Sequence, residues 1–360
     1  MRVAMIGPSL SAQGGIATLA RTFLESQALQ AHEVRYFPTV GEGGKLRKLA
    51  QMARGQAGFV GSLLGGFTPD LFHIHVADGA SFFRKMTYFQ QARTTGRPVI
   101  LHNNFANLEE LVARSSLHES LVRRCYSAAT QVHVVSHDMA SDIRQWTRGE
   151  ANIRVLFNPV PAAEFPWSGP RGDKDHPVVL FMGRVGERKG VFDLIEAWPQ
   201  VLARVPQARL RIGGDGDLDR LRARLAELGV ADSVDVMGWI SGADRLQAYA
   251  EADVYALPSY AEGLPVSVLE AMASGLAVLS TNVDGTPDAI VGGETGFMHE
   301  PGDRTAIAHG LAQLLEDVEL RDRMGAASRA RVEEVFDGEI LSRELVGYWD
   351  EALRAQPSSR

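Results

Sequence analysis

Short apolar runs alternate with helical patterns in the N-terminal part of the chain. Arg2–Ile6 is an apolar run followed by a glycine-rich loop, and the apolar residues of Ile16–Ala28 recur at helical spacing. Similar runs predict further strands at Leu71–Val76, Val99–Leu101, Gln131–Val135 and Ile153–Phe157. Strands that alternate with helices predict a parallel sheet covered by helices on both faces.

This pattern breaks between Asn158 and Pro177. The segment holds five prolines and two glycines without sustained periodicity, which is typical of an interdomain linker. A second series follows, with strands predicted at Val178–Met182, Ala208–Ile212, Val234–Met237, Val254–Leu257, Ala277–Ser280 and Gly296–Met298. Gly338–Ala355 has the apolar spacing of a final helix.

The length of the chain agrees with two domains. It has 360 residues, whereas single cores rarely grow beyond roughly 250–300 residues. Hydrophobic residues make up 45% and charged residues 22%, as in soluble globular proteins. We therefore predict an α/β protein with an N-terminal domain over residues 1–163 and a C-terminal domain over residues 164–339.

The cysteine content and the first ten residues indicate the cellular compartment of the protein. The single cysteine, Cys125, excludes an internal disulfide framework and fits a reducing compartment. Met1–Leu10 has the pattern of a first strand rather than of a signal peptide. The apolar stretch at Phe59–Phe67 is about half the length that a membrane-spanning helix needs. We expect a cytoplasmic protein.

Charge is distributed unevenly around a net value of −7. Residues 1–165 hold 17 Lys and Arg against 12 Asp and Glu, whereas the remainder holds 20 against 32. The basic half either meets an anionic partner or simply has its own solvated surface. We expect no nucleic acid among the partners.

Two loops of the second half carry candidate chemistry. Arg184 and Lys189 follow the predicted strand Val178–Met182 and precede a helix, where a guanidinium and an ammonium suit a diphosphate. A solvated basic turn is the alternative. Glu262 follows the predicted strand Val254–Leu257, and Glu270 lies inside the helix that begins near Pro265.

Those two carboxylates flank backbone groups that suit a phosphate. The amides of Gly263 and Leu264 precede the helix, where free N–H groups attract anions. Glu262 and Glu270 could accept hydrogen bonds from sugar and ribose hydroxyls. Chance spacing is the alternative, because the chain has 44 acidic residues.

Glycines and histidines mark the N-terminal half. Gly14-Gly15 at a helix start allows backbone to approach a ligand, but the loop lacks the dinucleotide fingerprint G-x-G-x-x-G. His102 and, more weakly, His75 lie at strand ends that face the ligand edge of such a sheet. His73 has the pattern of a buried histidine with satisfied hydrogen bonds.

No metal site is expected. The chain has no H-E-x-x-H string and no Cys/His cluster in sequence. Asp215, Asp217 and Asp219 form two D-x-D strings, but they lie between a predicted strand and a helix, so that a turn and a helix cap explain them.

Four of these features occur in a set order: Gly14-Gly15, the strand Pro98–Leu101 with His102 at its end, Arg184 with Lys189, and Glu262 with Glu270. Together they resemble the family 4 retaining glycosyltransferases of GT-B fold. Asn158-Pro159-Val160, Gly213–Gly216 and Met237–Ile240 also resemble segments of that family. Asp288 departs from it, because many relatives carry a glutamate there.

The resemblance implies two Rossmann-like domains facing across a cleft, with the last helix, about residues 340–360, crossing back to the N-terminal domain. It implies retaining hexosyl transfer from a UDP- or GDP-sugar to an acceptor hydroxyl, with no metal and no other cofactor. The implied catalytic residues are His102, Glu262, Arg184 and Lys189. The implied donor-binding residues are Gly14, Gly15, Arg184, Lys189, Gly263, Leu264 and Glu270, and His75 is a weaker acceptor residue.

Two alternatives remain: a GT-B-fold epimerase of sugar nucleotides, and a nucleotide-sugar-binding protein without catalysis.

A membrane hypothesis concerns the acceptor. In residues 44–54, basic positions alternate with Leu46 and Leu49 at helical spacing, and Arg84-Lys85 and Arg123-Arg124 add positive charge. A lipid-linked glycan acceptor at the inner membrane face, as in bacterial polysaccharide synthesis, would suit this pattern. The alternative to a membrane-binding surface is an ordinary amphipathic helix, interrupted by Gly55, Gly58 and Gly61, that packs its apolar side on the domain.

Overall fold

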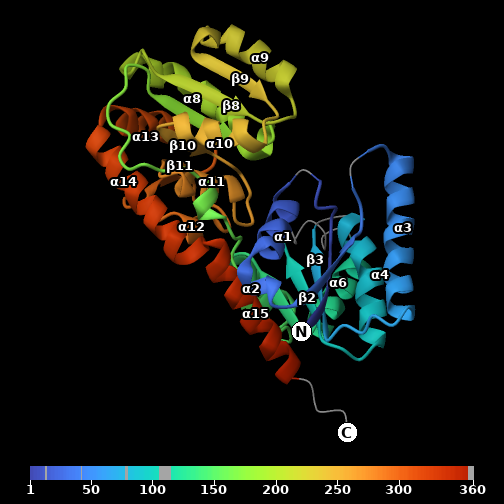
Figure 1. The fold of residues 1–360 in the computed structure, drawn as a ribbon. Coiled ribbons are helices and arrows are strands. Elements are labelled where there is room, and N and C mark those ends of the chain that lie inside the picture. The colour runs from blue at the N-terminus through green and yellow to red at the C-terminus, as the bar shows by residue number, and fades with distance from the viewer. Residues whose placement is uncertain (13, 42, 78–79, 105–114, 356–360) are drawn as a thin grey trace. The chain divides into compact units, whose positions relative to one another are not determined.

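A computed structural model describes residues 1–12, 14–41, 43–77, 80–104 and 115–355 (Figure 1). The chain divides into two compact units. Unit 1 comprises Met1–Pro159 and Gly338–Arg360, and unit 2 comprises Val160–Asp337. In the described ranges each unit contains one sheet of six parallel strands.

The sheet of unit 1 has the order β2-β1-β3-β4-β5-β6. Its strands are β1 Arg2–Gly7, β2 Glu33–Pro38, β3 Leu71–Val76, β4 Val99–Asn103, β5 Gln131–Val134 and β6 Ile153–Val155. The central strands are buried throughout, because helices cover both faces, and they therefore appear in the sequence as continuous apolar runs.

The helices of unit 1 are α1 Gly15–Glu25, α2 Gln27–Gln30, α3 Lys45–Leu64, α4 Ala80–Thr94, α6 Ser116–Ala128, α7 His137–Trp146 and α15 Gly338–Arg354. Helix α15 follows all of unit 2 in the sequence, yet it packs on unit 1 (Figure 1). Leu341, Leu345 and Trp349 join one core cluster with residues of β1, β3 and α1. Burial of this apolar stripe holds the last helix against the first sheet.

The sheet of unit 2 has the order β12-β11-β10-β7-β8-β9, which is the Rossmann arrangement. Its strands are β7 Val178–Met182, β8 Arg209–Gly213, β9 Val234–Gly238, β10 Val254–Leu257, β11 Ala277–Thr281 and β12 Gly296–His299. The longer helices are α8 Val191–Arg204, α9 Leu218–Glu227, α10 Gly242–Glu251, α11 Val266–Ala273, α13 Arg304–Glu316 and α14 Val318–Arg331. Short helical segments are η1 Ala162–Glu164, η2 Glu187–Lys189, η3 Ala231–Ser233, α12 Thr286–Ala289 and η4 Val332–Phe336.

The predicted α/β fold with two Rossmann-like domains is confirmed, and every strand expected from the sequence is present. Strand β2 was missed. It is the edge strand of its sheet, and its charged and polar side chains alternate toward solvent, so it lacks a continuous apolar run. The expected linker contains one short helical segment, η1, between β6 and β7.

Helix α3 is continuous, and the prediction that its glycines interrupt it is wrong. A Cβ at Gly55 would lie 2.4 Å from the carbonyl oxygen of Pro38, so glycine lets the helix approach the end of β2. Tertiary packing here outweighs the low helix propensity of glycine, about 1 kcal/mol relative to alanine. Among the described helices, none is both long enough and apolar enough to cross a membrane.

Candidate functional site

The strand order of unit 2 reverses between β7 and β10. In open parallel sheets, ligands bind beyond the carboxyl ends of the strands at such a reversal. The loop after β7 contains Arg184 and Lys189, and the loop after β10 contains Glu262 and Gly263. The structure therefore brings both predicted donor-binding loops to one point of the sheet.

A partly buried ion pair joins the two loops. The Lys189 ammonium lies 2.5 Å from a Glu262 carboxylate oxygen, and the Ser259 hydroxyl donates to the same oxygen at 2.6 Å. Glycine at position 190 makes this approach feasible: its φ is +67°, and an added Cβ would lie 1.8 Å from the Pro258 carbonyl oxygen. Any larger residue would push the loops apart.

The backbone of Glu262 is fixed by a third loop, which follows β11. The Glu262 N–H donates to the Asp284 carboxylate at 2.6 Å, and the Gly285 N–H donates to the Glu262 carbonyl at 3.4 Å. Asp284 has a φ of +44°, a left-handed conformation that is uncommon outside glycine. Asp288 lies nearby in α12, and its carbonyl accepts a hydrogen bond from Arg331.

Arg184 and Gly263 present unused donors at this edge. The Arg184 side chain is exposed and has no hydrogen bond or ion pair with any residue in the described ranges. The Gly263 N–H likewise donates to none of them, and it precedes the amino end of α11. Leu264 is buried beside it, 4% exposed. Such donors near a helix N-terminus suit an anion.

Glu270 lies in the second turn of α11 and is 5% exposed. One carboxylate oxygen accepts from Arg245 at 2.6 Å and the other from the Tyr249 hydroxyl at 3.0 Å. Burial raises the pKa of Glu270, and Arg245 partly opposes that rise. Because a carboxylate has about four acceptor positions, capacity for ligand hydroxyls remains.

The sequence interpretation missed Arg245 and Tyr249. They are four residues apart on α10 and therefore share one face of the helix. That spacing was a usable signal, but only the fold shows that this face meets Glu270.

The D-x-D segment lies between β8 and α9, as expected, with Asp219 inside the helix, but Asp217 does not cap α9 with its side chain. Its backbone is occupied instead: the Asp217 N–H donates to the Val185 carbonyl at 3.0 Å, and the Val185 N–H donates to the Asp215 carbonyl at 2.6 Å. These bonds hold the loop after β8 against the loop that carries Arg184.

In unit 1 the strand order reverses between β1 and β3. The loop after β1 contains Gly14 and Gly15, and Gly15 is the first residue of α1. Gly14 is exposed with a φ of +130°, which favours glycine. The N–H groups of the first turn of α1 therefore lie at the ligand edge of this sheet.

Four buried histidines share one face of the same sheet. His73 and His75 alternate on β3, His75 pairs in register with His102 on β4, and His102 pairs with His133 on β5. All four side chains are fully buried. Burial lowers the pKa of each, that of His102 to about 3, so all four rings are neutral at pH 7.

A hydrogen-bond chain fixes the tautomer of His102. The Trp349 indole N–H, which can only donate, points at Nδ1 of His73 over 3.1 Å. His73 must then carry its proton on Nε2, which lies 3.1 Å from Nδ1 of His102. His102 in turn carries its proton on Nε2, and this buried N–H has no hydrogen-bond partner in the described residues.

His73 is therefore the buried, hydrogen-bonded histidine that the pattern predicted. His75 differs, because neither ring nitrogen has a hydrogen-bond partner among the described residues. One nitrogen each from His73, His75 and His102 lies within 4.8 Å of the others, a spacing that could hold a transition metal. Both ring nitrogens of His73 already make hydrogen bonds, to Trp349 and to His102. The three-histidine group also contains no carboxylate that would balance the charge of a metal ion.

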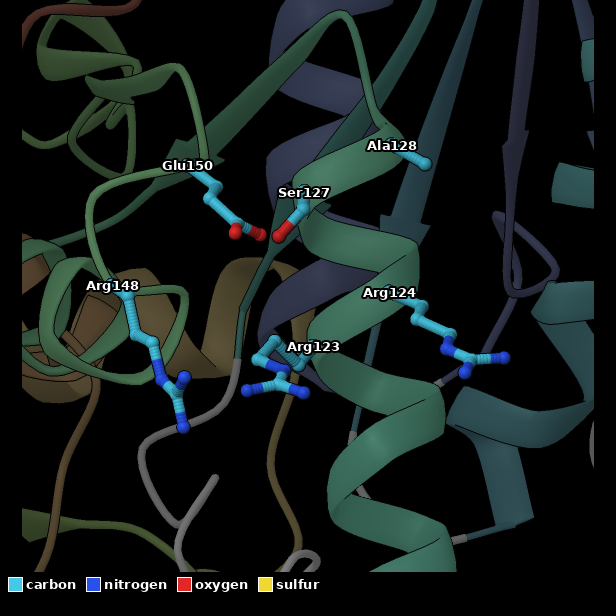
Figure 2. Close-up of a pocket in the computed structure, with 6 residues that line it drawn as sticks. All are labelled: Arg123, Arg124, Ser127, Ala128, Arg148 and Glu150. Carbon is cyan, nitrogen blue, oxygen red and sulfur yellow. The ribbon is translucent and has the colours of Figure 1, made fainter.

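A basic pocket of about 330 Å³ lies elsewhere in unit 1 (Figure 2). It is lined by Arg123, Arg124, Ser127, Ala128, Arg148 and Glu150. Figure 2 shows Arg123 and Arg148 extending to the same side, while Ser127 and Glu150 point toward one another. These residues precede β5 and β6, so the pocket lies at the amino edge of the sheet, away from Gly14 and His102.

Family comparisons cover most of the chain. Residues 3–159 match the family described as Glycosyl transferase 4-like domain, and residues 169–331 match the family described as Glycosyl transferases group 1. The two matches fall on the two units and meet near the boundary between them.

Curated relatives align with about half of the chain. Sulfoquinovosyl transferase SQD2 of Arabidopsis thaliana is 34% identical over 202 residues, 54% of this chain and 37% of its own length. The GDP-mannose-dependent monoacylated alpha-(1-6)-phosphatidylinositol monomannoside mannosyltransferase of Corynebacterium glutamicum is 35% identical over 176 residues, 47% of this chain and 46% of its own. The aligned region thus spans about half or less of these relatives.

Solved structures share the fold over the whole chain. Sucrose-phosphate synthase from Thermosynechococcus elongatus has a TM-score of 0.83 at 21% identity, covering 99% of this chain and all (100%) of that chain. Anabaena HepE, solved in complex with UDP and glucose, has a TM-score of 0.76 at 18% identity, covering 98% and 100%. At these identities the likeness concerns the fold.

Proposed function

Because the chain belongs to the family 4 glycosyltransferases of GT-B fold, we propose that it transfers a sugar from a nucleotide diphosphate sugar to an acceptor hydroxyl. The observation that carries this proposal is the Lys189–Glu262 pair at the strand reversal of unit 2. The pair places a cation and a hydrogen-bond acceptor where a Rossmann-like sheet binds its ligand.

Unit 2 would hold the donor. Arg184 and Lys189 would contact the diphosphate, together with the Gly263 and Leu264 amides at the start of α11. As the sugar leaves, negative charge grows on the β-phosphate, and preorganised cations and amides lower the barrier. These cations supply the charge that a metal ion would otherwise bring, so we propose metal-independent transfer.

Glu262 and Glu270 would orient the rest of the donor. Glu262, anchored by Lys189 and Ser259, would accept hydrogen bonds from the sugar. Glu270, held by Arg245 and Tyr249, would accept from the ribose. Two carboxylates fixed in this way pre-position the donor without reorganisation at the reaction step. The donor would be a UDP- or GDP-hexose, and the structure of HepE with UDP supports a uridine nucleotide as the first to test.

In unit 1, the amides of Gly14 and Gly15 would help to bind the donor. The acceptor side would be supplied by His102 and, more weakly, His75. A pKa of about 3 makes His102 unsuited to general-base catalysis near pH 7. We propose that it acts at the reaction centre as a neutral donor through Nε2–H. With no protein base required, attack on the face that the diphosphate leaves would retain the anomeric configuration.

The acceptor is proposed to be a glycan or a lipid-linked glycan in cell-surface polysaccharide synthesis, met at the inner face of a membrane. The first turns of α3 support this surface. Leu46 is 84% exposed and Leu49 is 59% exposed, so neither covers the core, and Arg47, Lys48 and Arg54 are exposed beside them. Each basic residue near anionic lipid contributes about 1 kcal/mol, and the leucines add apolar burial.

Sedimentation with anionic vesicles tests the membrane proposal. Binding at low ionic strength should weaken with salt and be lost in Arg47→Glu/Lys48→Glu. Arg148→Glu, at the amino edge of the sheet, is the matched control and should bind as the wild type does. Wild-type protein that stays in the supernatant at low salt would favour a soluble acceptor.

Nucleotide-sugar turnover separates transfer from the alternatives. A thermal-shift panel of UDP- and GDP-sugars comes first, since a ligand at a hundredfold excess over Kd adds roughly 2.7 kcal/mol of stability. The stabilising donor is then assayed for release of nucleoside diphosphate. Release supports a transferase. An isomerised sugar nucleotide would indicate an epimerase, and tight binding without either product would indicate a binding protein.

A further inference from the structure

Lys85 is a buried lysine in unit 1. It lies on α4, three residues after the buried Phe82 and four before the buried Phe89, so it falls on the helix face that packs on the sheet. Its exposure is 1%. The sequence interpretation counted Arg84-Lys85 among surface charges, and for Lys85 this is wrong, because helical spacing places it among apolar residues.

A buried ammonium requires a counter-charge or loses its proton. The pKa of Lys85 is lowered to about 7, first by burial and then by the positive charge of Arg84. Among the described residues, no carboxylate opposes that change. Within residues 1–104 and 115–355, apart from the gaps given above, Nε of Arg84 is itself buried without a hydrogen-bond partner. In this described part of unit 1, two adjacent cations therefore share one region without an anion.

His75 extends the same region. Lys85 lies close enough for its charge to lower the pKa of His75, with the neighbouring His102 and His133 acting in the same direction. Both ring nitrogens of His75 are buried and unpartnered among the described residues. The titratable groups of the described residues that act on His75 are thus neutral or cationic. This electropositive setting favours an anion over a metal ion.

The position is one where ligands bind. Lys85 follows β3 in the second turn of α4, and β3 ends at the strand reversal of unit 1. His75 is the penultimate residue of that strand. The carboxyl edge of the sheet at such a reversal is the ligand edge of the fold.

We propose that Lys85 and Arg84, with His75, form an anion subsite in unit 1 that takes a phosphate or diphosphate group of the acceptor. A phosphate group carries a charge of about −1.5 to −2 at pH 7, which matches the two cations. The assignment to the acceptor rests on the proposed function. The subsite itself is independent of the donor residues of unit 2, and it is therefore tested separately.

Calorimetric titration of inorganic pyrophosphate into the full chain tests the subsite. Because Arg184 and Lys189 would also attract this ion, the titration is performed in an Arg184→Ala/Lys189→Ala background. Binding should persist there and weaken at least tenfold when Lys85→Met is added. Lys85→Arg should retain binding, since it restores the charge, and Arg97→Met, which replaces an exposed cation just before β4, is the matched control with unchanged affinity.

Proton uptake provides a readout that a merely structural lysine would not change. An anion beside Lys85 raises its pKa from about 7, so binding at pH 7.5 should take up protons. Titrations in HEPES and in Tris, whose ionisation enthalpies differ, measure this uptake. It should disappear in Lys85→Met, whose folding is checked by its circular dichroism and its thermal transition.

Farnesyl diphosphate distinguishes the source of the anion. Affinity at least tenfold above that of pyrophosphate identifies a lipid-linked diphosphate, whereas equal affinities identify a soluble phosphate, and both support the subsite. The subsite is overturned if Lys85→Met binds pyrophosphate as its parent does, or if Arg184→Ala/Lys189→Ala alone abolishes binding. Binding of UDP or GDP, measured separately, reports on the donor site and can fail or persist independently.

Discussion

The hydrogen-bond chain Trp349–His73–His102 links helix α15 to the central strands β3 and β4 of unit 1. Replacing Trp349 by phenylalanine removes the only donor that the described structure gives to Nδ1 of His73, over 3.1 Å. His73 can then exchange its protonated nitrogen, and His102 loses the fixed tautomer that aims Nε2–H away from His73. The perturbation therefore reaches a residue on β4 from a change in α15.

The size of the effect follows from burial. A buried acceptor left without its donor costs about 1–3 kcal/mol. Trp349 is fully buried, so the smaller phenyl ring adds roughly 1 kcal/mol of lost apolar burial at about 25 cal/mol per Å². We expect Trp349→Phe to lower the free energy of unfolding of unit 1 by about 2–4 kcal/mol.

A double-mutant cycle with His73→Leu isolates the hydrogen bond from the packing. Hydrogen–deuterium exchange of β3 and β4 peptides reports the stability of unit 1 separately from that of unit 2. In the His73→Leu background, Trp349→Phe should cost at least about 1 kcal/mol less than in the wild type. Trp198→Phe, which breaks a similar indole bond to Ser233 in unit 2, is the control and should leave these peptides unchanged.

Equal costs of Trp349→Phe in both backgrounds, within about 0.5 kcal/mol, would refute the coupling. Long-range ¹⁵N–¹H spectra of the imidazoles supply a second check. His73 and His102 should each carry the proton on Nε2, and a proton on Nδ1 of either ring would contradict the deduced chain.

Two further predictions concern unit 2. Gly190→Ala should lower the free energy of unfolding of unit 2 by at least about 2 kcal/mol, because the new Cβ would lie 1.8 Å from the Pro258 carbonyl oxygen. Gly186→Ala, whose new Cβ would meet open space, is the control and should cost less than about 0.5 kcal/mol. Urea denaturation measures both free energies. Burial raises the pKa of Glu270 above the usual 4.5, so the native state binds its proton more tightly than the unfolded state. The stability this adds is present below about pH 4.5 and lost as pH rises through the native pKa. Urea denaturation from pH 4 to 7 should therefore show the wild type losing stability relative to Glu270→Gln.

Sequence periodicity was sufficient for the fold because parallel strands are buried on both faces. The runs at β3, β7 and β10 have the bounds that the structure gives them. Edge strand β2 escaped because its side chains alternate toward solvent. The apolar stripe of α15 predicted a helix, and only the family resemblance implied that this helix returns to the N-terminal unit, as it does.

The sequence predicted the candidate site only to the extent that it showed which residues follow the end of a strand. Arg184, Lys189, Glu262 and Glu270 follow strands, so their shared edge could be expected. The partners that hold them could not be, since Arg245 and Tyr249 come from another helix and meet Glu270 only through the fold. Lys85 shows the converse: its local sequence is basic and suggests a surface, whereas packing buries it.

We propose that unit 2 holds the nucleotide-sugar donor between the loops after β7 and β10. Hydrogen–deuterium exchange of the full chain with and without saturating UDP or GDP tests this most directly. Residues 183–190 and 259–266 should become protected by the nucleotide that binds, and the protection should weaken in Glu270→Ala. Protection confined to unit 1, or unchanged exchange in both loops under saturating nucleotide, would contradict the claim.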